Sequence, residues 1–219
     1  MHNDTASQYK NNSSEEDSIA GVGTFLWEIV KVCVLAYIII VPIRAFLFQP
    51  FFVQGASMDP NFKNGQYLII GELGYKKTDV NLFGLSLFTV HPSKEFTRQE
   101  IVVFHPPIPV EGEKFFIKRI IGLPGETVEI KNGQVIIINK EHPEGQVLDE
   151  SAYLSTKVPT YPQGSSTSYS VHLADDEYFV MGDNRPASHD SRAFGPITKD
   201  KVTGRVLLRA WPLGESRMY

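Results

Sequence analysis

Cysteine is nearly absent from this chain of 219 residues, because Cys33 is the only one. A single cysteine excludes an internal disulfide and a zinc site built from cysteines. A large excess of one charge is also lacking, since 21 Lys and Arg stand against 25 Asp and Glu, for a net charge of -4. This balance gives no support for nucleic-acid binding. The chain beyond the N-terminal region also lacks the 3.6-residue apolar period of amphipathic helices, so we expect a β body there.

The longest apolar run lies near the N-terminus. About 20 residues span a bilayer core, and Ile29 to Phe48 is apolar apart from a few residues, with Lys31 and Arg44 near its ends. Both side chains can extend to the headgroups from such positions. We therefore expect a polar tail over 1–23 and a transmembrane anchor over 24–48. A cleaved secretory signal is the alternative, because Gly55-Ala56-Ser57 could pass as its cleavage site, but the length of the run favours an anchor.

The remaining residues, 49–219, read as one mainly β domain. Lys131-Asn132-Gly133 between two apolar runs is a strong hairpin signal, and Leu123-Pro124-Gly125-Glu126 fits a type II turn. Strands are predicted at 67–70, 101–104, 115–121, 127–130, 134–138, 178–181 and 204–211. Residues of about 128–175 contain a stretch rich in Pro, Gly, Ser, Thr and Tyr, which indicates a small inserted subdomain of loops and short strands.

An apolar cluster interrupts the first part of this domain. Its members are Val80, Leu82, Phe83, Leu85, Leu87, Phe88 and Val90. A hairpin packed on the core would account for it. Alternatively, an exposed apolar cluster marks an interaction surface, here one that touches the membrane. The sequence leaves both interpretations open.

Two residues could perform chemistry together. Ser57 lies in Gln54-Gly55-Ala56-Ser57-Met58-Asp59-Pro60, just after the apolar run, where small residues leave room for another backbone. A plain juxtamembrane turn would also fit that heptad. Lys118 lies in an apolar strand, on the same face as Phe116 and Ile120. Burial there would lower the pKa of the amine, although a lysine at a strand edge can also serve to prevent aggregation.

A third polar element is the segment Met181 to Arg192, which reads MGDNRPASHDSR. Its aspartates, arginines and small hydrogen-bonding residues are typical of a loop held by its own polar network. Taken alone, it could be an Asx-rich turn with no further role.

The three motifs together closely resemble those of bacterial type I signal peptidases. These motifs are Ser57-Met58-x-Pro60, the run from Lys118 to Glu126, and Gly182-Asp183-Asn184-Arg185 with Asp190-Ser191-Arg192. Their order, their spacing and their place after an N-terminal anchor match from about Thr24 to the C-terminus. The resemblance implies a membrane-bound serine endopeptidase that removes signal peptides from exported preproteins after an Ala-x-Ala-like site. It implies no cofactor and no metal, an exoplasmic antiparallel β-sheet body, and a single-pass location in the plasma membrane with the catalytic domain on the extracytoplasmic face.

Residue roles follow from the same resemblance. Ser57 matches the nucleophile and Lys118 the general base, while Ser188 matches the serine that orients the lysine amine. Asp190 and Arg192 match a supporting ion pair. The pockets for the substrate side chains at -1 and -3 match Phe51, Val53, Met58 and Ile117. The partners expected are exported preproteins and membrane lipid.

Several positions depart from the family pattern. Arg98-Gln99-Glu100 stands where an Arg-Gly-Asp is usual, Pro186 replaces a second Asp after Asn184-Arg185, and Asn61 replaces a threonine. Gly55 stands where some members have a serine hydroxyl in the oxyanion hole. The hole would then depend on backbone N–H groups, chiefly that of Ser57. The apolar insert at 80–90 also looks longer than is typical.

Three other functions compete with this one. A Ser-His-Asp triad could use His189 and Asp190, although adjacent side chains rarely point the same way. A self-cleaving repressor also uses a Ser-Lys pair, but it would need a DNA-binding helix pair instead of an acidic tail and an apolar run. A membrane-anchored peptide-binding scaffold with a decayed site would not be expected to retain Ser57, Lys118 and Ser188.

Overall fold

The computed structural model describes residues 23–39, 48–75, 78–82, 85–90, 93–108, 114–154, 158–164 and 166–219. The chain divides into two compact units, Met1–Ala45 and Phe46–Tyr219. In the first unit, residues 23–39 form a helix whose side chains are almost all exposed. Within the described parts of the chain, no helix reaches the length and apolar character needed to cross a bilayer. The predicted anchor also includes residues 40–47, which lie outside the described residues.

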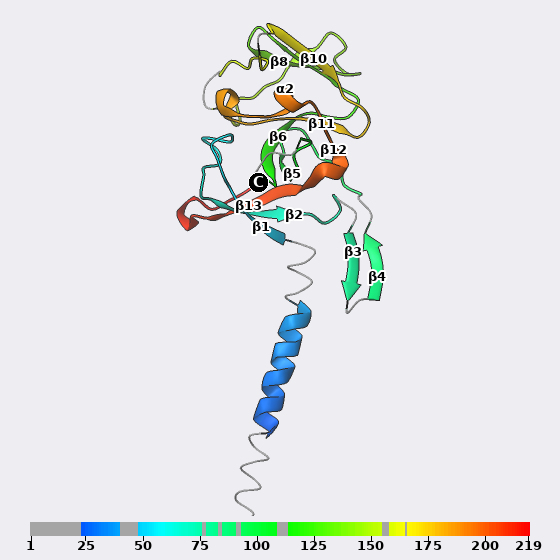
Figure 1. The fold of residues 1–219 in the computed structure, drawn as a ribbon, viewed down its shortest axis with the longest axis vertical. Helices are drawn as coiled ribbons and strands as arrows, with labels where there is room; N and C mark the ends of the chain where they lie inside the picture. The colour runs from blue at the N-terminus through cyan, green and yellow to red at the C-terminus, as the bar shows by residue number, and fades with distance from the viewer. Residues whose placement is uncertain are drawn as a thin grey trace, which may run out of the picture. The chain divides into compact units, whose positions relative to one another are not determined.

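The second unit is built on one large sheet, seen in the lower part of the β body in Figure 1. Its strands, described in spatial order, are β1 (Phe48–Phe52), β2 (Tyr67–Gly71), β13 (Val202–Trp211), β5 (Ile101–Phe104), β6 (Phe116–Gly122), β11 (Glu177–Met181) and β12 (Ile197–Thr198), with β14 (Arg217–Met218) paired to β13. Every pairing is antiparallel. The prediction of a mainly β, antiparallel body is therefore confirmed.

A smaller, separate sheet lies at the top of Figure 1, in the region where a small inserted subdomain was predicted. It consists, in spatial order, of β10 (Ser168–His172), β7 (Thr127–Lys131), β8 (Gln134–Ile138) and β9 (Gln146–Val147). The hairpin predicted at Asn132-Gly133 is confirmed, because Lys131 pairs with Gln134 and the two turn residues have φ of 54° and 77°. A two-residue turn with both φ positive matches the natural twist of a hairpin.

Short elements complete the unit. Among the residues that the structure describes, they are α2 (Ser191–Phe194) and the 3-10 helices η2 (Arg185–Ala187), η3 (Lys199–Lys201) and η4 (Leu213–Glu215). A separate hairpin contains β3 (Thr78–Leu82) and β4 (Leu85–Val90). The side chains of its apolar cluster lie outside what the structure describes, so the choice between core packing and membrane contact stays open.

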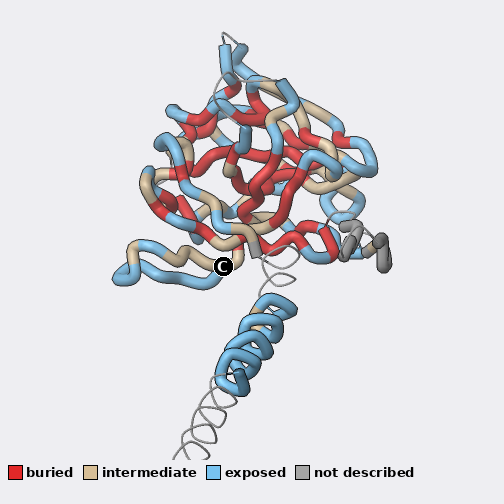
Figure 2. The backbone as a smooth tube through the Cα atoms, turned by 60° about the horizontal axis from the view of Figure 1, so that its bottom comes forward, coloured by how far each residue is buried: buried red, intermediate tan, exposed pale blue. Residues whose placement is uncertain are grey.

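The core explains how β5 and β6 come to lie in the middle of the sheet. Residues on opposite faces of the sheet pack into different apolar clusters. On β6, Phe116 and Ile120 belong to one cluster and Ile121 belongs to another. This matches the predicted alternation of faces along β6. Figure 2 shows that buried residues concentrate in the centre of the β body, and nearly all residues of β5 and β6 are buried. A polar side chain on β6 is consequently held among rigid, close-packed neighbours.

Candidate active site

The Ser57 turn begins where β1 ends. Gly55 has a φ of 83°, which suits glycine, and its N–H donates to Asn64 Oδ1 at 3.1 Å. Two further backbone bonds close the turn, from Asp59 N to Ala56 O and from Phe62 N to Met58 O. Met58 and Phe62 are buried in the core. The turn is therefore anchored on its inner side while Ser57, half-buried, faces outward.

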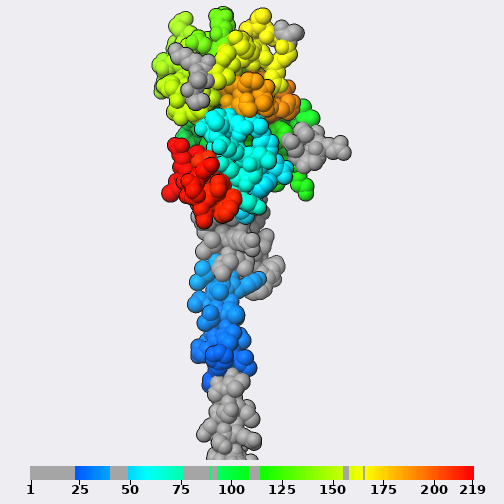
Figure 3. All heavy atoms as spheres, turned by 90° about the vertical axis from the view of Figure 1, so that its left-hand side faces the viewer, coloured from blue at the N-terminus to red at the C-terminus, as the bar shows by residue number. Residues whose placement is uncertain are grey.

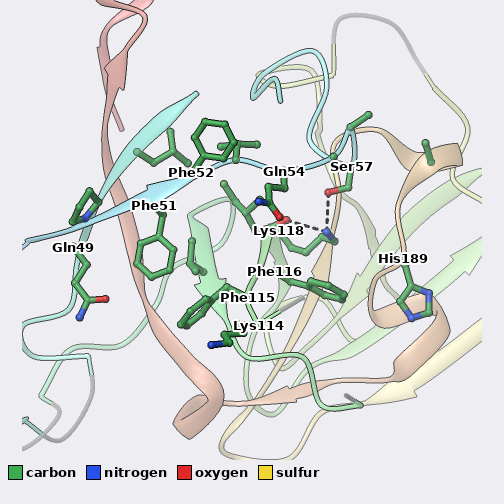
Figure 4. Close-up of a pocket in the computed structure, with 18 residues that line it drawn as sticks. Gln49, Phe51, Phe52, Gln54, Ser57, Lys114, Phe115, Phe116, Lys118 and His189 are labelled. Atoms are coloured by element: carbon green, nitrogen blue, oxygen red, sulfur yellow. Dashed lines mark hydrogen bonds between the residues drawn. The ribbon is translucent and has the colours of Figure 1, made fainter. Parts of the chain in front are cut away.

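Lys118 meets Ser57 from β6. A hydrogen bond of 2.8 Å joins Lys118 Nζ to Ser57 Oγ, and Nζ also donates to the Ile117 carbonyl at 3.0 Å. The lysine is only 3% exposed, and its Nζ lies 5.0 Å from the centre of the Phe116 ring. The apolar surroundings predicted for this amine are therefore present. Figure 4 shows the two side chains pointing toward one another, with the hydrogen bond dashed.

The loop from Gly182 to Arg192 packs against this turn. Asn184 makes two contacts to it, from its backbone N–H to Ser57 O and from Nδ2 to Ala56 O, each at 3.0 Å. Figure 3 shows the orange residues of this region against the cyan residues that include the turn. Gly182 lies deeper, where a Cβ would come within 2.4 Å of Ser57 O and 2.2 Å of Ser188 Oγ. Only glycine fits at that position.

Asp190 and Arg192, the expected ion pair, do form one. Arg192 Nε and Nη2 donate to the two carboxylate oxygens of Asp190 at 2.8 Å each, and both residues are buried. Asp190 Oδ2 also accepts from Gly182 N at 3.0 Å. The pair thus fixes the loop backbone beside Ser57 through Gly182. A buried bidentate pair of this kind resists rearrangement because either charge alone would be costly.

Ser188 lies in the same loop and is buried, packed against Gly182. Its Oγ has no hydrogen-bond partner among the described residues. The structure therefore shows the serine beside the Ser57 turn without the contact to the amine that was expected of it. Its orienting role stays a prediction.

A groove of about 680 Å³ runs past Ser57 and Lys118. Three of the residues matched to substrate pockets, Phe51, Val53 and Ile117, line it. Met58, the fourth, is not part of this lining and is 1% exposed. One wall is β1, an edge strand whose described pairing partner is β2 alone. The opposite wall is the segment from Lys114 to Lys118. The groove can therefore hold an extended chain between two walls.

The rival triad of His189 and Asp190 is not assembled. Both carboxylate oxygens of Asp190 are bonded to Arg192, and Asp190 is fully buried. The exposed ring of His189 packs edge-on against Phe116 and Phe194. Figure 4 shows His189 pointing away from Ser57. The group that meets Ser57 Oγ is the lysine.

The sequence analysis did not identify the residues that link the separate segments around the site. Asn61, noted only as a departure from a threonine, donates through Nδ2 to Asp183 Oδ2 at 2.9 Å and to Tyr153 O at 2.7 Å. Arg98, in the altered Arg-Gln-Glu triplet, donates to Glu126 Oε1 at 2.6 Å. The departures from the family pattern at and beside these residues were the available signal, but their partners are distant in the chain and could not be named.

Comparisons with known proteins show the family to which the chain belongs. The sequence matches the family described as signal peptidase, peptidase S26, over residues 26–211. It is 34% identical to a probable signal peptidase I-2 of Synechocystis over 189 residues, 85% of this chain and 73% of that protein. It is 29% identical to signal peptidase IB of Staphylococcus aureus over 186 residues, 83% of this chain and 87% of that protein.

A solved signal peptidase I from Enterococcus faecalis is 31% identical and covers 51% of this chain and 97% of that chain, with a TM-score of 0.38. The family match itself spans most of the present sequence. The protein is therefore a peptide-bond hydrolase of the signal peptidase I type. The chain belongs to the signal peptidase family, peptidase S26.

Proposed function

We propose that the protein is a membrane-anchored serine endopeptidase that removes signal peptides from exported preproteins, with Ser57 as nucleophile and Lys118 as general base. The observation that supports this most directly is the 2.8 Å hydrogen bond between Ser57 Oγ and Lys118 Nζ, at a lysine that is 3% exposed. A nucleophile within hydrogen-bond reach of a base is the arrangement that acyl transfer requires. Burial disfavours the charged amine and so favours the form that can accept a proton.

The reaction proceeds in two halves. Ser57 Oγ attacks the carbonyl carbon of the scissile bond while Lys118 Nζ takes the hydroxyl proton, and Lys118 then gives this proton to the leaving amine. The acyl group remains on Ser57 as an ester. A water molecule next loses a proton to Lys118 and attacks the ester, and Lys118 returns a proton to Ser57 Oγ. The Lys118 amine thus returns to its initial neutral state at the end of the cycle, as a general base must.

The backbone of Ser57 would stabilise the oxyanion. The N–H of Gly55 already donates to Asn64, and the bonds that close the turn start from Asp59 and Phe62. The Ser57 N–H takes part in none of these bonds. A backbone donor directed at developing negative charge contributes roughly 3 kcal/mol to such reactions.

The substrate would bind as an added strand along β1. Val53 directs both its N–H and its C=O toward the β2 side, bonding Gln66 O and Gly65 N. Because these directions alternate along an antiparallel strand, the backbone groups of Phe52 and Gln54 face the groove. An extended Ala-x-Ala segment can pair with such an edge, with its small side chains against Phe51, Val53 and Ile117.

The apolar run over 24–48 would serve as the anchor, and the partners would be membrane lipid and the preproteins. Residues beyond about 49 would then lie on the outer face of the plasma membrane, where cleavage sites emerge. The experiment that tests the activity uses the full-length chain in detergent and a preprotein peptide with an Ala-x-Ala site. Mass spectrometry should detect cleavage after the second alanine, and Ser57→Ala should produce none. Binding of the peptide by the parent without cleavage would favour the scaffold instead.

A further inference from the structure

A second groove, of about 440 Å³, continues from the first. Ala187 and His189 line both grooves, so the two are adjacent. Figure 4 shows that Phe51 and Phe115 lie at one end of the first groove and His189 at the other, with Ser57 and Lys118 between. The second groove is lined mainly by Pro159, Tyr161, Pro162, Pro186, Ala187 and His189.

One wall of this groove is the strap, which we define as residues 158–164. The strap is fixed to its surroundings by several hydrogen bonds. Thr160 N donates to Gly133 O at 2.9 Å, and Thr160 Oγ1 accepts from Arg185. Tyr161 O accepts from Arg192 Nη1 at 3.2 Å, and Gln163 Nε2 donates to Ser188 O at 2.6 Å. The strap is thus attached to the same loop that packs on the Ser57 turn.

The strap presents alternate residues to solvent. Thr160 and Pro162 are buried, while Pro159, Tyr161 and Gln163 are exposed. Tyr161 is 61% exposed beside the groove, although its backbone carbonyl is held by Arg192. A preorganised apolar surface binds at low entropic cost, because little further ordering is needed.

The arginines in the wall of the groove are already paired. Arg185 is bonded to Glu150 and Arg192 to Asp190, and both arginines are buried. Both positive charges are neutralised by carboxylates of the protein itself, so the two arginines are poorly placed to bind an acidic residue of a ligand. What the groove offers a ligand is the surface of prolines, an alanine and a tyrosine, with Gln163 and the His189 ring beside them. That surface favours an apolar side chain.

We propose that the second groove binds an apolar side chain of the preprotein downstream of the cleaved bond, within the first residues of the mature part. This inference rests on the proposed function, which places the residues upstream of the bond along β1, against Phe51 and Val53. A chain that lies there and presents its scissile carbonyl to Ser57 must leave past Ala187 and His189. It then reaches the strap, where Tyr161 is an exposed aromatic residue in the lining of the groove.

The test uses four peptides with the same Ala-x-Ala upstream sequence and the full-length protein in detergent. One peptide has serine at positions +1 to +3, and the others have a single leucine at +1, +2 or +3. We expect one leucine position to raise kcat/KM over the all-serine peptide by about five- to tenfold, the range that a partly exposed apolar contact supports. Tyr161→Ser should bring this ratio close to one. Leu213→Ser, a change at a 72% exposed residue outside both grooves, should leave the ratio unchanged.

The outcomes separate the two proposals. Cleavage of all four peptides at equal rates by the parent would overturn this inference and leave the proposed function standing. A preserved leucine preference in Tyr161→Ser would also overturn it. If Tyr161→Ser lacks a cooperative thermal transition, His189→Gln at the junction of the grooves takes its place, with the same expected loss of preference. Failure of the parent to cleave any of the four peptides would overturn the proposed function and this inference with it.

Discussion

Asp183 binds Arg119 through two parallel hydrogen bonds, from Nε to Oδ1 at 2.8 Å and from Nη2 to Oδ2 at 2.6 Å, and both side chains are buried. Arg119 follows Lys118 in β6, and Asp183 lies in the loop that carries Ser188. The guanidinium also stacks over the Tyr153 ring at 4.1 Å. The pair thus connects the strand of the amine to the loop that supports Ser57.

Removing the carboxylate should destabilise the fold strongly. Asp183→Ala leaves a buried guanidinium without its counter-charge, which typically costs about 3–5 kcal/mol. Denaturant unfolding of the full-length protein measures this loss. The matched control is Lys199→Ala, which removes an ion pair to Glu95, whose side chain is 70% exposed, and should cost no more than about 1 kcal/mol. Similar losses for the two variants would contradict the prediction.

The Ser57 and Lys118 variants should lose activity while remaining folded. Ser57→Ala removes only a hydroxyl, and we expect kcat to fall at least about a thousandfold. Lys118→Arg should be equally inactive, because a guanidinium does not give up its proton in the accessible pH range. Ser188→Ala should slow turnover less than either. Peptide cleavage followed by mass spectrometry measures the rates, with the exposed Lys131→Ala as control. Lys118→Arg activity near that of the parent would end the Ser-Lys proposal.

The pH dependence of cleavage should reflect the same base. Only a neutral amine can accept the Ser57 proton, so we expect kcat to rise with pH as the Lys118 amine becomes neutral. The measurement is a pH–rate profile in detergent with a peptide that has no titratable side chains. A rate that falls as the pH rises from neutral would count against the neutral lysine.

Glu126 should contribute stability that acid removes. Burial alone would raise the pKa of this carboxyl, but hydrogen bonds from Arg98, Asn139 and the Leu123 N–H outweigh it and hold the pKa below its ordinary value. Its contribution is therefore complete above the unfolded-state pKa, about 4.3, and is lost as the pH falls through the folded-state pKa.

The corresponding variant is Glu126→Gln. We expect it to lower the free energy of unfolding at neutral pH by about 1–3 kcal/mol, since it weakens hydrogen bonds to a buried charge. The difference from the parent should shrink in strong acid, as the pH falls through the lowered folded-state pKa and the parent carboxyl becomes protonated as well. Unfolding curves at both pH values provide the measurement. A difference that grows toward low pH would have the wrong sign.

The β unit should fold without the N-terminal segment. A fragment over Phe46–Tyr219 contains every described strand and the buried clusters, so we expect a cooperative thermal transition. It should cleave detergent-presented peptide but process membrane preproteins poorly, because tethering raises the local concentration of substrate. A fragment that starts at Gly55 lacks β1 and Val53, and should melt at a lower temperature. Equal melting temperatures would show that β1 adds nothing to the core.

Local signals in the sequence predicted much of the sheet. The Asn132-Gly133 turn, the Pro124-Gly125 turn and the alternation along β6 depend on residues close in the chain, and each matches the structure. The class of fold could be predicted for the same reason. The three motifs that contain Ser57, Lys118 and Asp190 could likewise be found, because each motif is contiguous.

The connections between distant segments could not be predicted. Gln163 bonds to Ser188 and Asn61 to Tyr153 across folded contacts that no periodicity encodes. The extent to which each side chain is buried could not be predicted from the sequence either. Met58 and Phe51 look alike as apolar residues near Ser57, yet Met58 is buried in the core while Phe51 lines the groove.

The absence of a side chain at Gly182 limits the substitutions that this protein can accept during evolution. The backbone of Ser57 and the hydroxyl of Ser188 both border the space left by the missing side chain, so even a methyl group there would displace them. Substitutions at the exposed residues of the strap should change the stability of the fold little. Under the proposal above, such substitutions can alter the substrate preference. A library of all single substitutions selected for secretion should therefore tolerate variety at Tyr161 and return glycine alone at 182.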